Sequence, residues 1–200
     1  MPPDLHIIDN ILSDTDFKKL QYLWSQPIYR PVAHTAYAEE QQNIYDSQFV
    51  RVLYNQNFNI VDRYLHVWDP LYEKLDVQSI HLARMNITLP RREGEERISG
   101  YHVDMEGEKD ILTCLYYLNS NNGGTMFEES GQFIQSVENR AVVFRNGLRH
   151  SAVFCTDATF RFVYNLNYRP NPNHKILGGS YVDTVEATSN HVRSFSFENA

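Results

Sequence analysis

Between residues 77 and 168 the sequence is a series of short apolar runs, separated by turn residues such as Asn146-Gly147. Runs of this length, bounded by Gly, Asn and Asp, are typical of β-strands. A series of short strands preceded by one or two helices predicts a mainly β (α+β) protein with a double-sheet jelly roll, not a doubly wound α/β fold. We expect strands near residues 77–88, 98–104, 110–118, 124–128, 132–137, 140–145, 150–155 and 159–168.

The first 76 residues predict a helical support for this β core. Ser13 is suited to cap a helix over residues 14–25, with an acid three positions later as in a capping box. Apolar residues at helical spacing follow it. A short strand is expected over residues 5–12, and a second helix around residues 58–75.

The chain has 200 residues, which suits one domain and is marginal for two. We therefore expect a single domain over residues 1–200. Within it, we expect residues 1–76 to form the helical N-terminal support, residues 77–170 the β core that carries any functional site, and residues 171–200 a C-terminal extension.

Composition limits the classes of partner. The net charge of −7 argues against nucleic acid, because a phosphate backbone requires a basic face. Cys114 and Cys155 lie in apolar, strand-like runs and are expected to be buried free thiols, as in a reducing compartment. The sequence shows neither a signal-peptide pattern nor an apolar run that could span a membrane. We expect a cytoplasmic protein with no membrane partner, in the host-cell cytoplasm if a phage encodes it.

The segment 159–168, TFRFVYNLNY, alternates with period two. Its aromatic residues and Leu166 lie on one face; Arg161, Asn165 and Asn167 share the other. This pattern fits an ordinary surface strand. It equally fits a barrel strand whose polar face lines an interior site.

The segment 110–118, DILTCLYYL, is apolar on both faces, which predicts a buried central strand. Tyr117 and Thr113 share one of its sides. A buried tyrosine hydroxyl needs a hydrogen-bonding partner. If that partner is a ligand, Tyr117 and Arg161 face the same cavity.

His102 and Asp104 stand two positions apart in an extended segment, so their side chains project to the same side. A second histidine, His150, begins a later strand. Two imidazoles and one carboxylate on one face of a metal leave positions open, as in non-haem Fe(II) oxygenases. The plain alternative is a buried histidine that is hydrogen-bonded to its neighbour. Arg161 favours the metal site, because an arginine on an interior face implies an anionic ligand.

Together, these motifs resemble the Fe(II)/2-oxoglutarate-dependent dioxygenases, in particular the prolyl-4-hydroxylase-like branch and the small oxygenases of marine phages. The resemblance covers roughly residues 77–170 and implies a double-stranded β-helix of the cupin-like kind. It is carried by H-x-D (102–104), TCLYYLN (113–119), GG-T-x-F (123–127), VENRAVVF (137–144), His150 and Arg161.

The resemblance also implies roles for single residues. His102, Asp104 and His150 would bind Fe(II). Arg161 would pair with the distal carboxylate of 2-oxoglutarate, and Tyr117 would donate to that same carboxylate.

The strand before the H-x-D motif supplies a further cosubstrate contact in prolyl hydroxylases. Here Asn86 is the first candidate and Arg84 the second, while Asn165 and Thr113 complete the expected cosubstrate pocket.

The resemblance further implies O2 as the oxidant, leaves room for ascorbate, and favours hydroxylation of a prolyl or other amino-acid substrate, in a peptide, a protein or free. The loops 26–46 and 90–99 are expected to carry the selectivity.

Three alternatives stay open. One is an AlkB-like nucleic-acid dioxygenase, although Val163 stands where that group has an arginine. Another is a non-catalytic jelly-roll binding module. The third is a cupin that uses Zn or Mn, in which Arg161 and Tyr117 would have no role.

Overall fold

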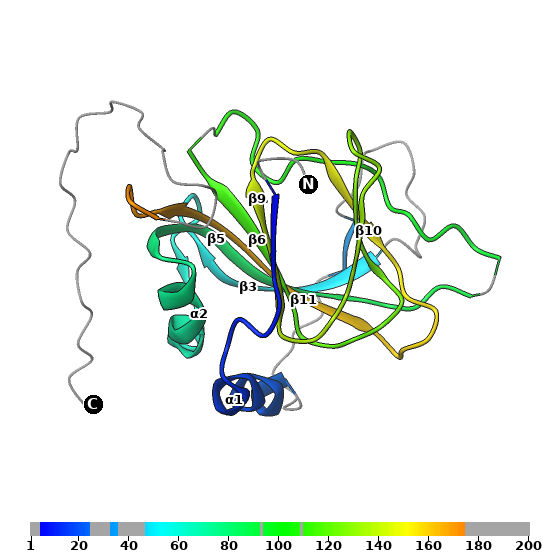
Figure 1. Cartoon of the computed structure of the whole chain (residues 1–200), viewed down its shortest axis with the longest axis horizontal. Helices are drawn as coiled ribbons and strands as arrows, with labels where there is room; N and C mark the ends of the chain where they lie inside the picture. The colour runs from blue at the N-terminus through cyan, green and yellow to red at the C-terminus, as the bar shows by residue number, and fades with distance from the viewer. Residues whose placement is uncertain (1–4, 25–32, 36–46, 93, 109, 175–200) are drawn as a thin grey trace.

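The computed structural model describes residues 5–24, 33–35, 47–92, 94–108 and 110–174. Two antiparallel sheets face each other, and two short helices lie against the outer side of the larger one (Figure 1). The helices are α1 (Asp14–Trp24) and α2 (Asp69–Lys74), with a 3-10 turn η2 (Leu65–Trp68) before α2. The strands are β1 (Leu5–Ile8), β2 (Ala33–Thr35), β3 (Ser47–Asn55), β4 (Ile60–Val61), β5 (Val77–Thr88), β6 (Leu112–Tyr117), β7 (Gly124–Phe127), β8 (Phe133–Gln135), β9 (Arg140–Arg145), β10 (His150–Val153) and β11 (Arg161–Pro170).

The larger sheet has the order β1-β9-β6-β11-β5-β3-β2, with β4 paired to β3, and the smaller has the order β10-β7-β8. β11 lies between β6 and β5 and pairs with both over most of its length. It is therefore buried on both faces, and its two sets of side chains enter different layers.

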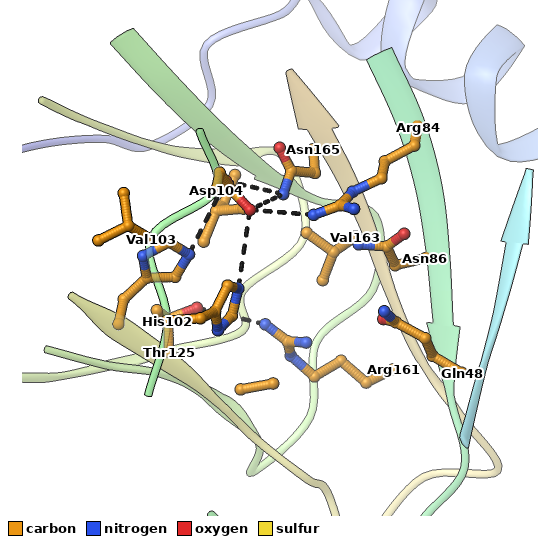
Figure 2. A pocket seen from close by; sticks show the side chains of 13 residues that line it. Gln48, Arg84, Asn86, His102, Val103, Asp104, Thr125, Arg161, Val163 and Asn165 are labelled. Carbon is orange, nitrogen blue, oxygen red and sulfur yellow. Dashed lines mark hydrogen bonds and ion pairs between the residues drawn. The ribbon is translucent and has the colours of Figure 1, made fainter. Parts of the chain in front are cut away.

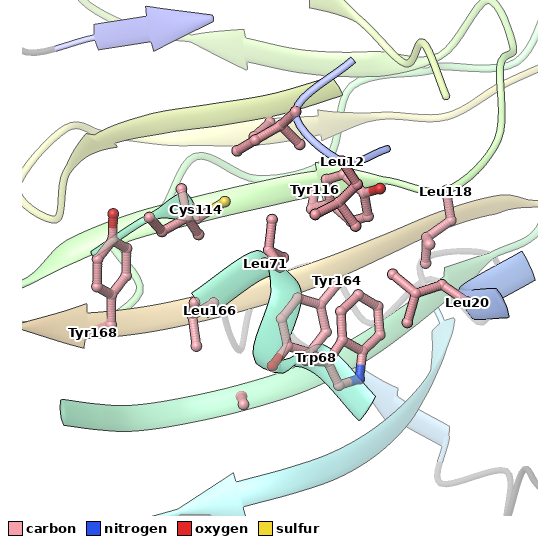
Figure 3. Close-up of a cluster of buried hydrophobic side chains, with 14 of the residues drawn as sticks. Leu12, Leu20, Trp68, Leu71, Cys114, Tyr116, Leu118, Tyr164, Leu166 and Tyr168 are labelled. Atoms are coloured by element: carbon pink, nitrogen blue, oxygen red, sulfur yellow. The ribbon is translucent and has the colours of Figure 1, made fainter. Parts of the chain in front are cut away.

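The outer face of the larger sheet carries the main apolar core. Tyr164 of β11 stacks on Trp68, with ring centroids 3.7 Å apart, and its hydroxyl lies 2.5 Å from that of Tyr72 in α2 (Figure 3). Phe17 of α1 packs edge-on against Tyr116 of β6. Both helices thus cover the aromatic side of β6 and β11, which leaves the opposite side of these strands free to line the space between the sheets.

Several local expectations are confirmed. The Asp16 amide donates to Ser13 Oγ, so Ser13 caps α1, and the Ser13 hydroxyl donates to the Asp16 carboxylate. Cys114 and Cys155 are both buried and free. Neither helix of the described residues has the length and apolar character needed to cross a bilayer.

The N-terminal support is only partly helical. β3 was not expected, and it joins the larger sheet beside β5. Its alternation is broken by a register shift between Val52 and Tyr54, which places apolar residues at adjacent positions and conceals the strand pattern. The helix expected over residues 58–75 is reduced to η2 and α2, after the two-residue strand β4.

The prediction of a strand over residues 98–104 is also wrong. This segment contacts β10 through two isolated bridges, Ile98 to Val153 and His102 to His150. The expected selectivity loop 26–46 lies outside the described residues, apart from β2. The expected C-terminal extension also lies outside them beyond residue 174.

Candidate metal centre and adjoining pocket

The two histidines are brought together by the backbone. The amide of His102 donates to the carbonyl of His150 at 3.0 Å, and the amide of His150 donates back at 3.0 Å. This bridge sets the imidazole rings 4.6 Å apart. This one antiparallel bridge therefore holds the two histidines side by side, although they are far apart in the sequence.

Each ring is oriented by a carbonyl two residues earlier in the chain. His150 Nδ1 lies 3.0 Å from the Leu148 carbonyl, and His102 Nδ1 lies 3.3 Å from that of Gly100. A carbonyl can only accept, so each Nδ1 carries a hydrogen, and a neutral ring in this tautomer has its Nε2 lone pair available for a metal. Burial also lowers the pKa of His150, which keeps this imidazole neutral.

Asp104 completes the cluster. Its Oδ1 lies 3.7 Å from His102 Nε2 and its Oδ2 lies 3.9 Å from His150 Nε2. One ligand atom from each of the three residues lies within 4.8 Å of the others. Two neutral imidazole nitrogens and a carboxylate are a donor set that fits Fe(II) or a similar divalent ion.

The carboxylate of Asp104 is fully buried and held by three donors from the larger sheet, of which Arg84 and Asn165 are drawn in Figure 2. Arg84 Nη2 lies 2.9 Å from Oδ1, Asn165 Nδ2 lies 3.1 Å from Oδ2, and Asn167 Nδ2 lies 3.2 Å from Oδ2. Burial acts to raise the pKa of Asp104, but contact with His102 and the charges of Arg84 and His150 outweigh it and hold the pKa below its ordinary value. The group is an anion at neutral pH.

Arg161 lies on the same inner face of β11 and is only 4% exposed. Its Nε donates to Ser136 Oγ at 3.2 Å, its Nη2 donates to Thr125 Oγ1 at 3.3 Å, and its guanidinium lies 5.4 Å from the centre of the Tyr117 ring. Among the described residues, none of its hydrogen-bonding partners is a carboxylate. A buried cation with only neutral partners leaves room for an anion.

Tyr117 does not line the cavity directly. Its hydroxyl donates to Thr125 Oγ1 at 2.8 Å, and burial raises its pKa, so the hydroxyl stays protonated as a donor. Thr113 is farther still from the cavity, where it accepts a hydrogen bond from Asn167 at 2.9 Å.

All of these groups surround one pocket of about 200 Å³ between the two sheets (Figure 2). Of the residues singled out in the sequence, those that line it are the three metal-binding candidates together with Arg84, Asn86, Arg161 and Asn165. Tyr117 stands one hydrogen bond behind the lining, through Thr125. Thr113 stands farther back, because its partner Asn167 is itself outside the lining. The lining consists of Gln48, Arg84, Asn86, His102, Val103, Asp104, Leu115, Thr125, His150, Ala152, Arg161, Val163 and Asn165.

Three polar residues at the site were not singled out as functional from the sequence. Thr125 belongs to the GG-T-x-F motif, which is a signal that could have identified it. Ser136 and Gln48 have no such signal. Ser136 meets Arg161 across the space between the sheets, and Gln48 lies opposite Thr88 across the β3–β5 pair, so only the strand pairing brings them in.

The comparisons with known proteins show what this architecture is like. No family model and no curated sequence matches the chain. Solved structures do. A viral collagen prolyl hydroxylase from Paramecium bursaria Chlorella virus-1, in complex with 2-oxoglutarate, aligns at 12% identity over 83% of this chain and 96% of its own, with a TM-score of 0.54.

Two further structures agree. A prolyl hydroxylase from Trichoplax adhaerens, bound to a peptide fragment of the hypoxia-inducible-factor oxygen degradation domain, aligns at 12% identity over 84% of each chain, with a TM-score of 0.57. A 2-oxoglutarate/Fe(II) oxygenase-family oxidoreductase from Burkholderia pseudomallei aligns at 12% identity over 90% of this chain and 88% of its own, with a TM-score of 0.59. The chain therefore has the jelly-roll fold of the 2-oxoglutarate/Fe(II) oxygenases, as the sequence resemblance implied.

Proposed function

We propose that this chain is an Fe(II)- and 2-oxoglutarate-dependent dioxygenase that hydroxylates a C–H bond and releases succinate and CO2. The observation that carries the proposal is the placement of two kinds of binding group in one pocket. The His102, Asp104 and His150 ligand atoms stand at one side, and the buried Arg161, which has no carboxylate partner among the described residues, stands in the same lining.

The metal would be held by His102 Nε2, His150 Nε2 and one oxygen of Asp104. Both imidazoles have the tautomer that coordination requires, because each Nδ1 is committed to a carbonyl. Fe(II) bound there would supply the O2 chemistry, with 2-oxoglutarate as the co-oxidised substrate. The protein's own share is to bind, orient and shield the reactants.

Arg161 would bind the distal carboxylate of 2-oxoglutarate. Thr125 assists it, since its hydroxyl oxygen already accepts from Tyr117 and from Arg161 and its own hydrogen is free to donate to that carboxylate. Tyr117 thus acts through Thr125. Asn86 and Asn165 would line the cosubstrate channel, and Thr113 would support it from behind through Asn167.

The substrate would be a prolyl residue or another amino acid, free or in a peptide. The peptide complex of the Trichoplax adhaerens hydroxylase supports this class.

The decisive experiment measures succinate formation and O2 uptake by the purified protein with Fe(II) and 2-oxoglutarate, with ascorbate present and absent. Mn(II) and 2-oxoglutarate binding are measured in parallel by calorimetry, which needs no turnover. We expect both ligands to bind and succinate to form slowly even without substrate. A protein that neither binds 2-oxoglutarate nor forms succinate would contradict the proposal.

A further inference from the structure

Arg84 is a second arginine in the pocket, where the proposed function already assigns the distal carboxylate of 2-oxoglutarate to Arg161. Arg84 stands on the inner face of β5, opposite Asn165 of β11 and Val52 of β3. Its side chain is 23% exposed and lines the cavity, with the guanidinium turned towards Asp104 (Figure 2). Its one hydrogen bond to a described residue uses a single N–H of Nη2. Four of its five donors therefore remain for another partner.

Asp104 does not depend on Arg84 for its hydrogen bonds. Asn165 donates to both of its oxygens, at 3.3 and 3.1 Å, and Asn167 donates to Oδ2 at 3.2 Å. A metal ion on Asp104 would supply a further positive neighbour. The ion pair with Arg84 is thus one of several interactions that stabilise the Asp104 carboxylate. The guanidinium of Arg84 can therefore bind a second anion at the same time.

The charge balance of the loaded pocket points in the same direction. Its charged lining residues are two arginines, Arg84 and Arg161, and one acid, Asp104. The two positive charges of Fe(II) and the two negative charges of 2-oxoglutarate cancel, and metal-bound imidazoles are neutral. One positive charge is left over in a confined space, where an unbalanced charge is costly. An anionic substrate removes this cost and a neutral one does not.

The lining also limits the size and polarity of that substrate. The pocket encloses about 200 Å³, and in the described part of the chain its wall contains no phenylalanine, tyrosine or tryptophan. A proline ring within a peptide would gain most from aromatic neighbours. Around Arg84 the wall is instead amide-rich, with Gln48, Asn86 and Asn165.

From these observations we infer that Arg84 binds a carboxylate of the substrate, and that the substrate is a small carboxylic acid of the free amino-acid class rather than a residue within a peptide chain. This inference rests on the proposed dioxygenase function and names its substrate class. The planar fork of the guanidinium suits a carboxylate, which accepts two parallel N–H bonds.

The test compares each of the twenty common L-amino acids in three forms: the free acid, the N-acetyl acid, which keeps the carboxylate, and the primary amide, which removes it. Binding to the protein loaded with Mn(II) and 2-oxoglutarate is measured by calorimetry, and stimulation of O2 uptake is measured with Fe(II). At least one free acid is expected to bind and stimulate. Its N-acetyl form is expected to keep most of the affinity, and its amide to bind at least about tenfold more weakly, as loss of a charge-assisted pair implies.

The decisive variant is Arg84→Gln, read as the ratio of acid to amide affinity. The ratio is expected to fall towards one, whereas a residue that only orients Asp104 would weaken both forms alike and leave the ratio intact. Arg51→Gln is the matched control, because Arg51 is a similarly half-buried arginine on the neighbouring strand β3, paired with Asp62 at 2.7 Å and outside the pocket lining. It is expected to keep the wild-type ratio.

The inference is overturned if acid and amide bind the wild type equally, if no acid binds, if only an end-blocked prolyl peptide couples to turnover, or if Arg84→Gln keeps the wild-type ratio. In each of these cases a wild type that still consumes 2-oxoglutarate leaves the dioxygenase proposal standing. A wild type that does not bind or consume 2-oxoglutarate overturns both.

Discussion

Asp104 shows how one side chain serves both the structure and the proposed chemistry. Its carboxylate is buried, accepts from three side chains of β5 and β11, and lies between the two imidazoles. Because a buried anion is stable only when it is well paired, these contacts are needed with or without a metal.

Replacing Asp104 by alanine is expected to abolish metal-dependent succinate formation. Loss of an outer-shell partner alone costs up to about 100-fold in metal affinity, and loss of the ligand itself is expected to cost more. Calorimetry with Mn(II) and the succinate assay measure the two effects separately. Asp110→Ala removes a half-buried acid outside the pocket lining that pairs with Arg169, and it should leave both readings near the wild-type values. Iron-dependent turnover by Asp104→Ala would contradict the assignment.

Replacing Arg161 by alanine is expected to act on the cosubstrate. A charge-assisted contact is worth about 1.5–3 kcal/mol, so the KM for 2-oxoglutarate should rise about 10- to 100-fold with a smaller change in kcat. The matched control, Arg169→Ala, changes a half-buried arginine of the same strand that lies outside the pocket lining. An unchanged 2-oxoglutarate requirement in Arg161→Ala would remove this residue from the anchor role.

Much of the site at this scale was visible in the sequence because residues two positions apart in an extended segment project to the same side, even where the segment forms only isolated bridges. His102 and Asp104 converge as their spacing predicts, and Arg161 turns inward with Asn165. The partners of these residues were not visible. The pairing of distant strands decides which hydroxyl contacts Arg161 and which cation contacts Asp104. No local sequence pattern encodes that pairing.

At the scale of elements, β11 is the strand that organises the molecule. Its aromatic face packs under the helices, with Tyr164 stacked on Trp68. Its polar face supplies Arg161 and Asn165 to the cavity, and Asn167 to the carboxylate of Asp104. The alternation was clear in the sequence, but an ordinary surface strand would show the same pattern. The helices cover the aromatic side of β11, and this leaves the polar side facing the space between the two sheets.

The smaller sheet depends on one close approach between strands. A Cβ at Gly124 would collide with the carbonyl of Ile134 in the neighbouring strand β8. Gly124→Ala is therefore expected to lower the free energy of unfolding by about 1–3 kcal/mol, as overpacking does. Urea denaturation followed by circular dichroism measures this change.

Gly147→Ala is the control for that substitution, because a Cβ at Gly147 meets no atom within 4 Å. It should leave the unfolding midpoint almost unchanged. Equal stability of the two variants would show that the β7–β8 contact is not as close as described.

For the whole molecule, the candidate metal site lies where the two sheets meet. His150 belongs to β10 of the smaller sheet, while Asp104 is held by β5 and β11 of the larger one. A bound ion would therefore join the sheets, and binding to the folded state alone stabilises it by mass action.

Saturating the protein with Mn(II) is expected to raise the melting temperature. At an ion concentration 100 times the Kd the gain is about 2.7 kcal/mol. For a chain of this size the gain corresponds to a rise of about 5–10 °C. Scanning calorimetry before and after addition of a chelator measures the shift. His150→Ala should show none, whereas His81→Ala, which changes a part-buried histidine outside the pocket lining, should keep it. A shift that survives in His150→Ala would place the ion elsewhere.

The general plan of the molecule was more predictable than its boundaries. The jelly-roll class followed from the run of short strands, and the structural relatives confirm it. The contribution of β3 was not predictable, because the register shift near Leu53 removes the period that identifies a strand. The segment around His102 contains apolar residues typical of a strand, but it pairs with the neighbouring chain only at two isolated bridges and therefore forms no strand.

The alternation of β11 makes its pairing register decisive. A shift of one residue against β5 and β6 would exchange the two sides of the strand, since neighbouring residues project in opposite directions. Arg161 and the amides on Asp104 would then turn outward together, and the aromatic rings that support the helices would enter the pocket. A point substitution removes only the contacts of one residue, whereas a one-residue slip in this strand would disrupt the pocket lining and the helix packing together.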